Sequence, residues 1–239
     1  MSDPKSKLIV ALDVPDRAAA LKAIDRLSGH VGYFKLGMEI FTREGPRLVE
    51  EIKNRGEKIF LGLKFHDIPN TVRGAVRSAC QIGVQMLTVH ASGGPAMLVA
   101  ACEEAQASES KPLVLAVTAL TSLSQNDVQN LGVSGSIEQW VERLAALAHS
   151  TGIRGLVAST KELPMLRKRF QGEMKLVIPG IRPAGAALQD QSRAATPAEA
   201  IRDGADFIVV GRPILQAPDP AKAADTIAAE IQQAHHTSG

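Results

Sequence analysis

The chain has 239 residues, of which 45% are hydrophobic and 3% aromatic, and its 27 basic side chains nearly balance its 25 acidic ones. This length favours a single domain spanning residues 1–239, and the scarcity of aromatic side chains favours the aliphatic core of a parallel sheet covered by helices. The balanced charge argues against nucleic-acid binding, and no apolar stretch approaches the ~20 residues that a membrane-spanning helix needs.

Eight short apolar runs recur along the chain and are predicted to be strands. They are residues 8–12, 34–37, 59–64, 86–90, 113–118, 155–158, 176–179 and 207–210. Between them, residues 17–27, 141–148 and 221–231 carry apolar side chains at helical spacing. Strands that alternate with helices indicate parallel βαβ units, and eight such units predict an α/β fold of the closed (β/α)8, or TIM barrel, type. An open doubly wound sheet is the alternative, which the absence of a Gly-x-Gly-x-x-Gly turn after the first run disfavours.

Two connections that follow predicted strands are long and polar. Residues 121–135 are rich in Ser, Asn, Gln and Gly without clear apolar periodicity, and residues 183–191 form the second such loop. Long loops at strand ends are candidate lids over a ligand.

The beginning of the chain and its cysteines indicate a cellular location. The residues up to Lys7 are polar, and Asp13 interrupts the apolar run that follows, which argues against a signal peptide. Cys80 and Cys102 are the only cysteines and are far apart in sequence, as expected for inert thiols in a reducing compartment. We therefore expect a cytoplasmic protein.

Polar residues gather at the ends of the predicted strands. In a barrel, such residues converge on one mouth because the carboxyl ends of all parallel strands meet there. In chain order they are Asp13, Lys35, Lys64, Asp67, His90, Thr118, Thr121, Ser122, Pro179, Gly180, Arg182, Gly211 and Arg212. Each alone is weak evidence, but together they share one edge of one sheet.

Two lysines are expected to face a common cavity at this mouth. Gly62 and Lys64 are two residues apart on one strand and should point to the same face, which Lys35 on the neighbouring strand can reach. Two ammonium groups at ~4 Å repel each other by about 4 kcal/mol at an effective dielectric of ~20. Carboxylates should therefore stand between them, and Asp67 is one candidate.

The loops after the seventh and eighth strands each pair a glycine with an arginine, in residues 179–183 and 210–213. Glycine lets main-chain N–H groups approach an anion, and arginine offers a planar fork that suits phosphate oxygens. Barrel enzymes commonly bind phosphate at these two loops, so the sequence predicts a phosphate site there.

Residues 63–71, Leu-Lys-Phe-His-Asp-Ile-Pro-Asn-Thr, resemble the signature of orotidine 5′-phosphate decarboxylases. In that family an aspartate precedes these nine residues, where this chain has Gly62. Residues 11–13, 35–37, 120–122 and 179–183 resemble further segments of the same family, so that the resemblance covers nearly the whole chain.

The resemblance implies a reaction and a role for each matching residue. Orotidine 5′-monophosphate would lose carbon dioxide to give uridine 5′-monophosphate, in pyrimidine biosynthesis, without a metal or another cofactor. In the roles that the resemblance implies, Lys64 donates the proton, and Lys35 and Asp67 belong to a charged array. Asp13 and Lys35 contact the ribose, and Thr121 and Ser122 hold the pyrimidine. The phosphate is held by Pro179, Arg182, Gln191, Gly211 and Arg212, with Gln191 in a movable loop. Ile68 and Thr71 would contact the substrate, and Asp67 and Thr71 would reach into the site of a partner subunit, which implies a homodimer with shared sites.

Gly62 occupies the position of a catalytic aspartate in this family, so the resemblance also implies much reduced turnover with nucleotide binding retained. Two alternatives stay open. One is a non-catalytic or substrate-trapping nucleotide-binding variant of the same barrel. The other is a magnesium-dependent sugar-phosphate decarboxylase or aldolase relative, for which Glu39 is a candidate ligand. His66 and His90 are interpreted as structural, because histidines at strand ends often hold loops by hydrogen bonds.

Overall fold

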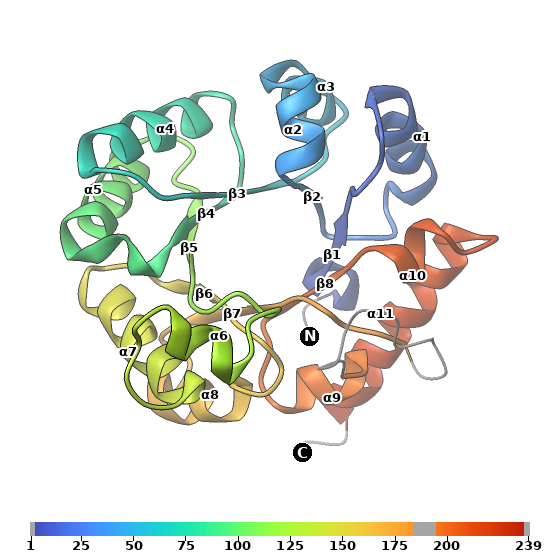
Figure 1. Cartoon of the computed structure of the whole chain (residues 1–239). Coiled ribbons are helices and arrows are strands. Elements are labelled where there is room, and N and C mark those ends of the chain that lie inside the picture. The colour runs from blue at the N-terminus through green and yellow to red at the C-terminus, as the bar shows by residue number, and fades with distance from the viewer. Residues whose placement is uncertain (1–2, 184–194, 237–239) are drawn as a thin grey trace.

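Eight parallel strands close into a barrel in the order of the chain (Figure 1). The structure, a computed structural model, describes residues 3–183 and 195–236. The strands are β1 (Leu8–Ala11), β2 (Tyr33–Leu36), β3 (Ile59–Phe65), β4 (Met86–His90), β5 (Leu113–Val117), β6 (Gly155–Val157), β7 (Lys175–Ile178) and β8 (Phe207–Val210). Each coincides with a predicted apolar run to within one residue at either end, so the TIM barrel is confirmed and the open doubly wound sheet is wrong.

Helices follow the strands and surround the barrel (Figure 1). They are α1 (Arg17–Leu27), α2 (Met38–Glu44), α3 (Pro46–Asn54), α4 (Pro69–Gln81), α5 (Gly94–Ala107), α6 (Gln125–Asn130), α7 (Ile137–Ser150), α8 (Leu163–Phe170), α9 (Pro197–Arg202), α10 (Arg212–Leu215) and α11 (Pro220–His236), with short 3-10 turns η1 (Pro4–Lys7) and η2 (Ala91–Gly93). The predicted helix over residues 17–27 is α1, and those over 141–148 and 221–231 lie within α7 and α11. None of the helices in the described ranges is both long and apolar enough to span a bilayer.

The connection over residues 121–135 was expected to be irregular, but it contains α6. Its helix start is polar: the Ser124 side chain accepts from the Asp127 N–H, and the Asp127 carboxylate accepts from the Ser124 N–H at 2.9 Å. This capping box stabilises a short helix without an apolar face, because Val128 is its single buried residue. Most of the second expected loop, residues 184–191, lies outside the described residues.

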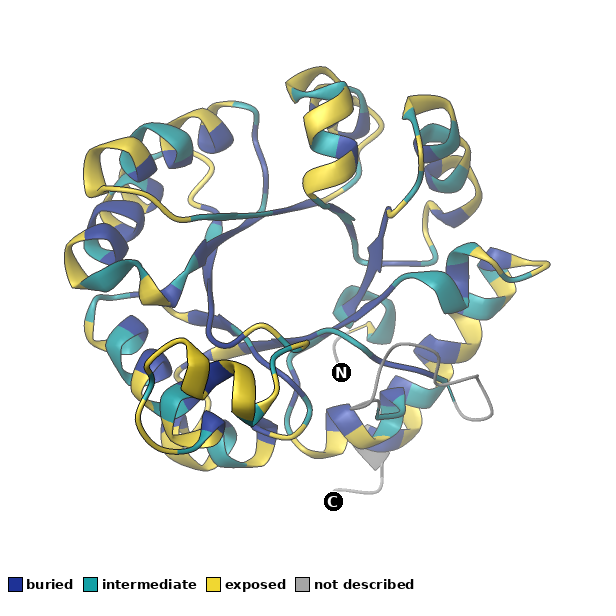
Figure 2. Cartoon of the chain, viewed as in Figure 1, coloured by how far each residue is buried: buried dark blue, intermediate teal, exposed yellow. Residues whose placement is uncertain are grey.

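The core has two parts, separated by the strands themselves. The larger part fills the space between strands and helices, and the smaller one fills the inside of the barrel. The inner part comprises Ile9, Ala11, Phe60, Met86, Leu115, Val177 and Val209, with Tyr33, Leu113, Val157 and Phe207 packed against them. Figure 2 shows the consequence: the strands are mostly buried, whereas the helices expose their outer faces. Successive residues of a strand alternate between these two parts of the core. A polar residue that follows the inner-core residues of its strand at a spacing of two therefore points into the barrel mouth.

Candidate active site at the barrel mouth

Strand alternation carries Lys35 into the barrel. On β2, Phe34 and Leu36 belong to the outer core, whereas Tyr33 packs against the inner one. Lys35 shares the inner face with Tyr33 and stands one layer closer to the carboxyl ends of the strands. By the same alternation Asp13 follows Ile9 and Ala11 on the inner face beyond β1. The sequence therefore places a lysine and an aspartate on the inner face of adjacent strands.

Four strand ends bring these two side chains together. Three glycines show how close the side chains are, since a Cβ atom built on each would touch them. A Cβ at Gly37 would lie 3.5 Å from both Asp13 Oδ1 and Lys35 Nζ, and one at Gly62 would lie 2.9 Å from Lys35 Cε and 3.5 Å from its Nζ. A Cβ at Gly211 would lie 3.6 Å from Asp13 Oδ2. Glycine thus leaves the space that Lys35 and Asp13 fill, and the Lys35 side chain extends over position 62.

The surroundings of Lys35 shift its pKa downward. Burial is the largest cause, the Asp13 carboxylate opposes it, and the Lys64 ammonium lowers the pKa further. The Lys64 ammonium is therefore close enough to affect Lys35, as expected for a shared cavity. The carboxylate that acts on Lys35 within the chain is Asp13. Asp67, expected between the lysines, lies instead on the exposed turn before α4, where its Oδ1 accepts from the Ile68 N–H at 2.6 Å.

Strand β3 is irregular at Lys64, although Leu61, Leu63 and Phe65 all pack against the outer core, so that Gly62 and Lys64 alternate to the inner face as their spacing predicts. Leu61 pairs with Leu87 and Phe65 with Val89, so β3 is bulged between these two pairs. Lys64 has a positive φ of 54°, and its N–H donates to Thr88 Oγ1 at 2.7 Å. Thr88 was not among the expected site residues. Its position on the inner face of β4, two residues before His90, is the one signal that could have indicated it.

Two histidines stand beside the lysines. The rings of His66 and His90 stack with centroids 5.2 Å apart and planes 19° apart. His90 Nδ1 accepts from the Ser92 N–H at 3.3 Å and lies 2.7 Å from the Ser92 hydroxyl. Burial, then His66 and Lys64, lower the pKa of His90, so that it is neutral near pH 7. Because its side chain accepts from the Ser92 N–H, His90 is the N-cap of η2, which agrees with the structural interpretation of this histidine.

The expected phosphate-binding residues lie after β7 and β8. Gly180 has a φ of 78°, a left-handed turn that glycine adopts without strain. The buried Arg182 donates from Nη1 to Ile181 O at 3.0 Å, and its main-chain N–H donates to Ala195 O at 3.0 Å. Gly211 and Arg212 begin α10. Pro179 and Arg212 are half-buried, and Gln191 lies outside the described residues.

The segment after β5 carries the expected pyrimidine contacts. Thr118 is fully buried and donates to Val157 O at 3.2 Å, which ties the end of β5 to β6. Thr121 is half-buried and Ser122 is exposed. These two side chains are therefore accessible to solvent, whereas the Thr118 hydroxyl is used by the fold.

No metal-binding group is present among residues 3–183 and 195–236, where no three His, Cys, Asp or Glu side chains are gathered closely enough to hold an ion. Glu39, the candidate magnesium ligand, is exposed in the first turn of α2.

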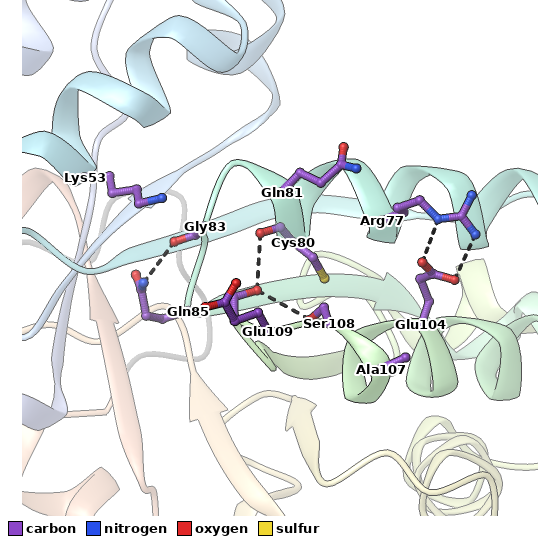
Figure 3. A pocket seen from close by; sticks show the side chains of 11 residues that line it. Lys53, Arg77, Cys80, Gln81, Gly83, Gln85, Glu104, Ala107, Ser108 and Glu109 are labelled. Atoms are coloured by element: carbon purple, nitrogen blue, oxygen red, sulfur yellow. Dashed lines mark hydrogen bonds and ion pairs between the residues drawn. The ribbon is translucent and has the colours of Figure 1, made fainter.

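A hollow of about 680 Å³ lies away from the mouth, between the carboxyl-terminal ends of α4 and α5 (Figure 3). Several of its polar groups are paired with one another. Arg77 Nε lies 2.7 Å from Glu104 Oε1, and Ser110 Oγ donates to Cys80 O at 3.2 Å. At one side of the hollow, the Gln85 side-chain amide donates to Gly83 O at 2.9 Å. The loops that line it lead into the amino-terminal ends of β4 and β5, an end of the barrel that usually serves stability. None of the expected site residues lines it.

Comparisons with known proteins show what the chain is similar to. The family model described as "Orotidine 5'-phosphate decarboxylase / HUMPS family" matches residues 6–227. The chain is 51% identical over 234 residues to the orotidine 5′-phosphate decarboxylase of Moorella thermoacetica, covering 95% of this chain and 93% of that one. It is 49% identical over 228 residues to the protein of the same name from Halorhodospira halophila, with 95% and 97% covered. The crystal structure of orotidine 5′-phosphate decarboxylase from Lactobacillus acidophilus superposes with a TM-score of 0.84 at 36% identity, over 94% of this chain and 98% of that one.

Proposed function

This chain belongs to the orotidine 5′-phosphate decarboxylase / HUMPS family, and we propose that it converts orotidine 5′-monophosphate to uridine 5′-monophosphate and carbon dioxide in pyrimidine biosynthesis. One observation carries the proposal. The Lys35 and Asp13 side chains converge on the glycines at the mouth of the barrel, where the Lys64 ammonium also affects Lys35, in a chain about half identical to decarboxylases over nearly its whole length.

The reaction breaks the bond between the pyrimidine ring and its carboxylate. The electron pair of that bond stays on the ring carbon when carbon dioxide leaves, so a fixed cation beside this carbon lowers the barrier. The Lys64 ammonium is proposed to perform this task and then to transfer a proton to the ring carbon, which leaves a neutral amine for solvent to reprotonate. Lys35, whose charged form the Asp13 carboxylate favours, is proposed to contact the ribose at the same cavity.

The phosphate is proposed to lie across the mouth, at the Gly180–Arg182 and Gly211–Arg212 turns. Both turns combine a glycine with an arginine, and they follow adjacent strands, since β7 pairs with β8. Contacts to this remote group can hold the base against the lysines, so that phosphate binding assists the chemistry at the ring. Thr121 and Ser122 are proposed to contact the pyrimidine, and Gln191 to close over the phosphate.

A homodimer with shared sites is proposed from the surface around the mouth. Asp67, Ile68 and Thr71 are exposed at the start of α4, and the Ile68 side chain is 67% exposed. Met38 and Leu120, in the segments after β2 and β5, are also exposed apolar residues. A second copy seated here would cover these residues and bring its Asp67 towards the lysine pair. We also place the protein in the cytoplasm, which fits its two buried, unpaired thiols.

Gly62 supports a second candidate function, nucleotide binding with little turnover. The ribose and phosphate contacts proposed above come from other strands, whereas a carboxylate is missing directly beside Lys35. Two measurements separate the candidates: the absorbance change of orotidine 5′-monophosphate on decarboxylation, and calorimetric binding of uridine 5′-monophosphate. Turnover that Lys64→Ala abolishes and a chelator leaves unchanged supports the decarboxylase. Binding without product supports the second candidate, and activity that a chelator removes supports a magnesium-dependent relative.

A further inference from the structure

The bulge of β3 holds Lys64 in a backbone conformation that lysine seldom adopts. Its φ of 54° lies in the left-handed region, where the Cβ of an L-residue is crowded. Between the pairs Leu61–Leu87 and Phe65–Val89, residues 62–64 of β3 stand opposite residue 88 of β4. Strained positions at a functional site persist when the surrounding structure holds them, so the contacts of residue 64 decide where its ammonium stands.

Thr88 supplies one of these contacts from the strand opposite the bulge. The bulge displaces the Lys64 N–H from the regular ladder, and a buried main-chain donor needs a partner. That donor bonds to Thr88 Oγ1 at 2.7 Å, and the Thr88 residue is only 3% exposed. On β4, Thr88 lies between Met86 and His90 on the inner face, and Met86 packs in the inner core.

We propose that Thr88 is a positioning residue for Lys64: its hydroxyl holds the main chain at the bulge and so sets where the Lys64 ammonium stands relative to Lys35. The proposal rests on the proposed function, in which Lys64 delivers the proton. Proton transfer requires the donor within hydrogen-bond reach of the acceptor, and a displacement of about 1 Å costs about 100-fold in rate. The ribose and phosphate contacts lie on other strands, so nucleotide affinity does not depend on this bond.

Two variants separate the hydroxyl from the shape of the side chain. Thr88→Val keeps the shape and removes the oxygen, whereas Thr88→Ser keeps the oxygen and removes a methyl group. We expect kcat to fall about 10- to 100-fold in Thr88→Val and to stay close to that of the unaltered chain in Thr88→Ser. Calorimetric affinity for uridine 5′-monophosphate should be unchanged in both. Assays are run well below the midpoint of thermal unfolding of each variant, so that all are fully folded.

Three results would overturn the assignment: an unchanged kcat in Thr88→Val, equal losses in both variants, or a parallel loss of nucleotide affinity. Because Gly62 is proposed to limit turnover, the same pair is also made in a Gly62→Asp chain. If neither parent decarboxylates the substrate, the proposed function fails, and a crystal structure of Thr88→Val then decides about Thr88. A φ at Lys64 that leaves the left-handed region supports the positioning role, and one that stays refutes it.

Discussion

A carboxylate introduced at position 62 tests the charge arrangement at the mouth most directly. The backbone accepts it, because Gly62 has no positive φ, and the atom nearest to a new Cβ is Lys35 Cε at 2.9 Å, part of a flexible side chain. The same Cβ would lie 3.5 Å from Lys35 Nζ, so the Gly62→Asp carboxylate would come within ~4 Å of that ammonium. At an effective dielectric of ~20 this attraction is about 4 kcal/mol. Each ~1.4 kcal/mol is a factor of ten in rate; if half to all of the attraction lowers the barrier, kcat/KM rises about 30- to 1000-fold.

The assay follows the absorbance of orotidine 5′-monophosphate for the unaltered chain, Gly62→Asp and Gly62→Asn. The asparagine variant is the matched control, since it fills the same space without the charge and should gain little. Binding of uridine 5′-monophosphate is measured in parallel and should differ far less than kcat. Equal rates for the unaltered chain and Gly62→Asp would refute the electrostatic reasoning. Equal gains for Asp and Asn would show that filled space, and not charge, restores the site.

Four further predictions address strain, charge, phosphate and assembly. Lys64→Gly should be more stable than Lys64→Ala by about 1 kcal/mol in urea unfolding, because glycine tolerates a positive φ; equal stabilities would exclude backbone strain. Lys35→Met should raise the unfolding midpoint at neutral pH, since burial lowers the pKa of Lys35 from 10.5 and the folded state therefore binds fewer protons than the unfolded one. Stability of the unaltered chain then rises with pH between the folded pKa and 10.5, so the advantage of Lys35→Met should shrink there, and a pH-independent difference would contradict this. Arg212→Ala should weaken the binding of uridine 5′-monophosphate about 10- to 100-fold, as expected for the loss of a charged hydrogen bond. The binding of uridine, which lacks the phosphate, should be unchanged by calorimetry. Ile68→Asp should shift sedimentation towards monomers, and an unaltered profile would count against the proposed interface.

The barrel could be predicted from the sequence because its strands are buried on both faces. Each strand is then a continuous apolar run, and polar residues such as Asp13 mark where a run ends. The same reasoning placed Lys35 at the mouth, since one residue of an otherwise apolar run carries a charge. Periodicity was less informative for α6, whose start depends on hydrogen bonds between Ser124 and Asp127 and not on an apolar face.

The bulge in β3 could not be predicted, because it depends on the register between two strands. Spacing alone puts Gly62 and Lys64 on one face, but it does not show that the pairing with β4 shifts between Leu61 and Phe65. The contact of Lys64 with Thr88 follows from that shift, so the sequence indicates the threonine only by its place on the inner face of β4, two residues before His90. Asp67 illustrates a different limit. Its place in the charged array was inferred from the family, and in one chain it lies on the exposed turn before α4, so its part in that array depends on the proposed homodimer.

The lysine arrangement at the mouth is held by the barrel and not by its own attraction. Burial and the Lys64 ammonium both disfavour a charged Lys35, and Asp13 opposes them only in part. The aliphatic core must therefore supply the stability that keeps two cations together, as expected where function and stability compete. An anionic nucleotide reverses this balance, because its phosphate and carboxylate bring negative charge to a site with excess positive charge. Ligand binding should then stabilise the fold by mass action, and by more for the carboxylated nucleotide than for its product if the carboxylate lies beside the lysines.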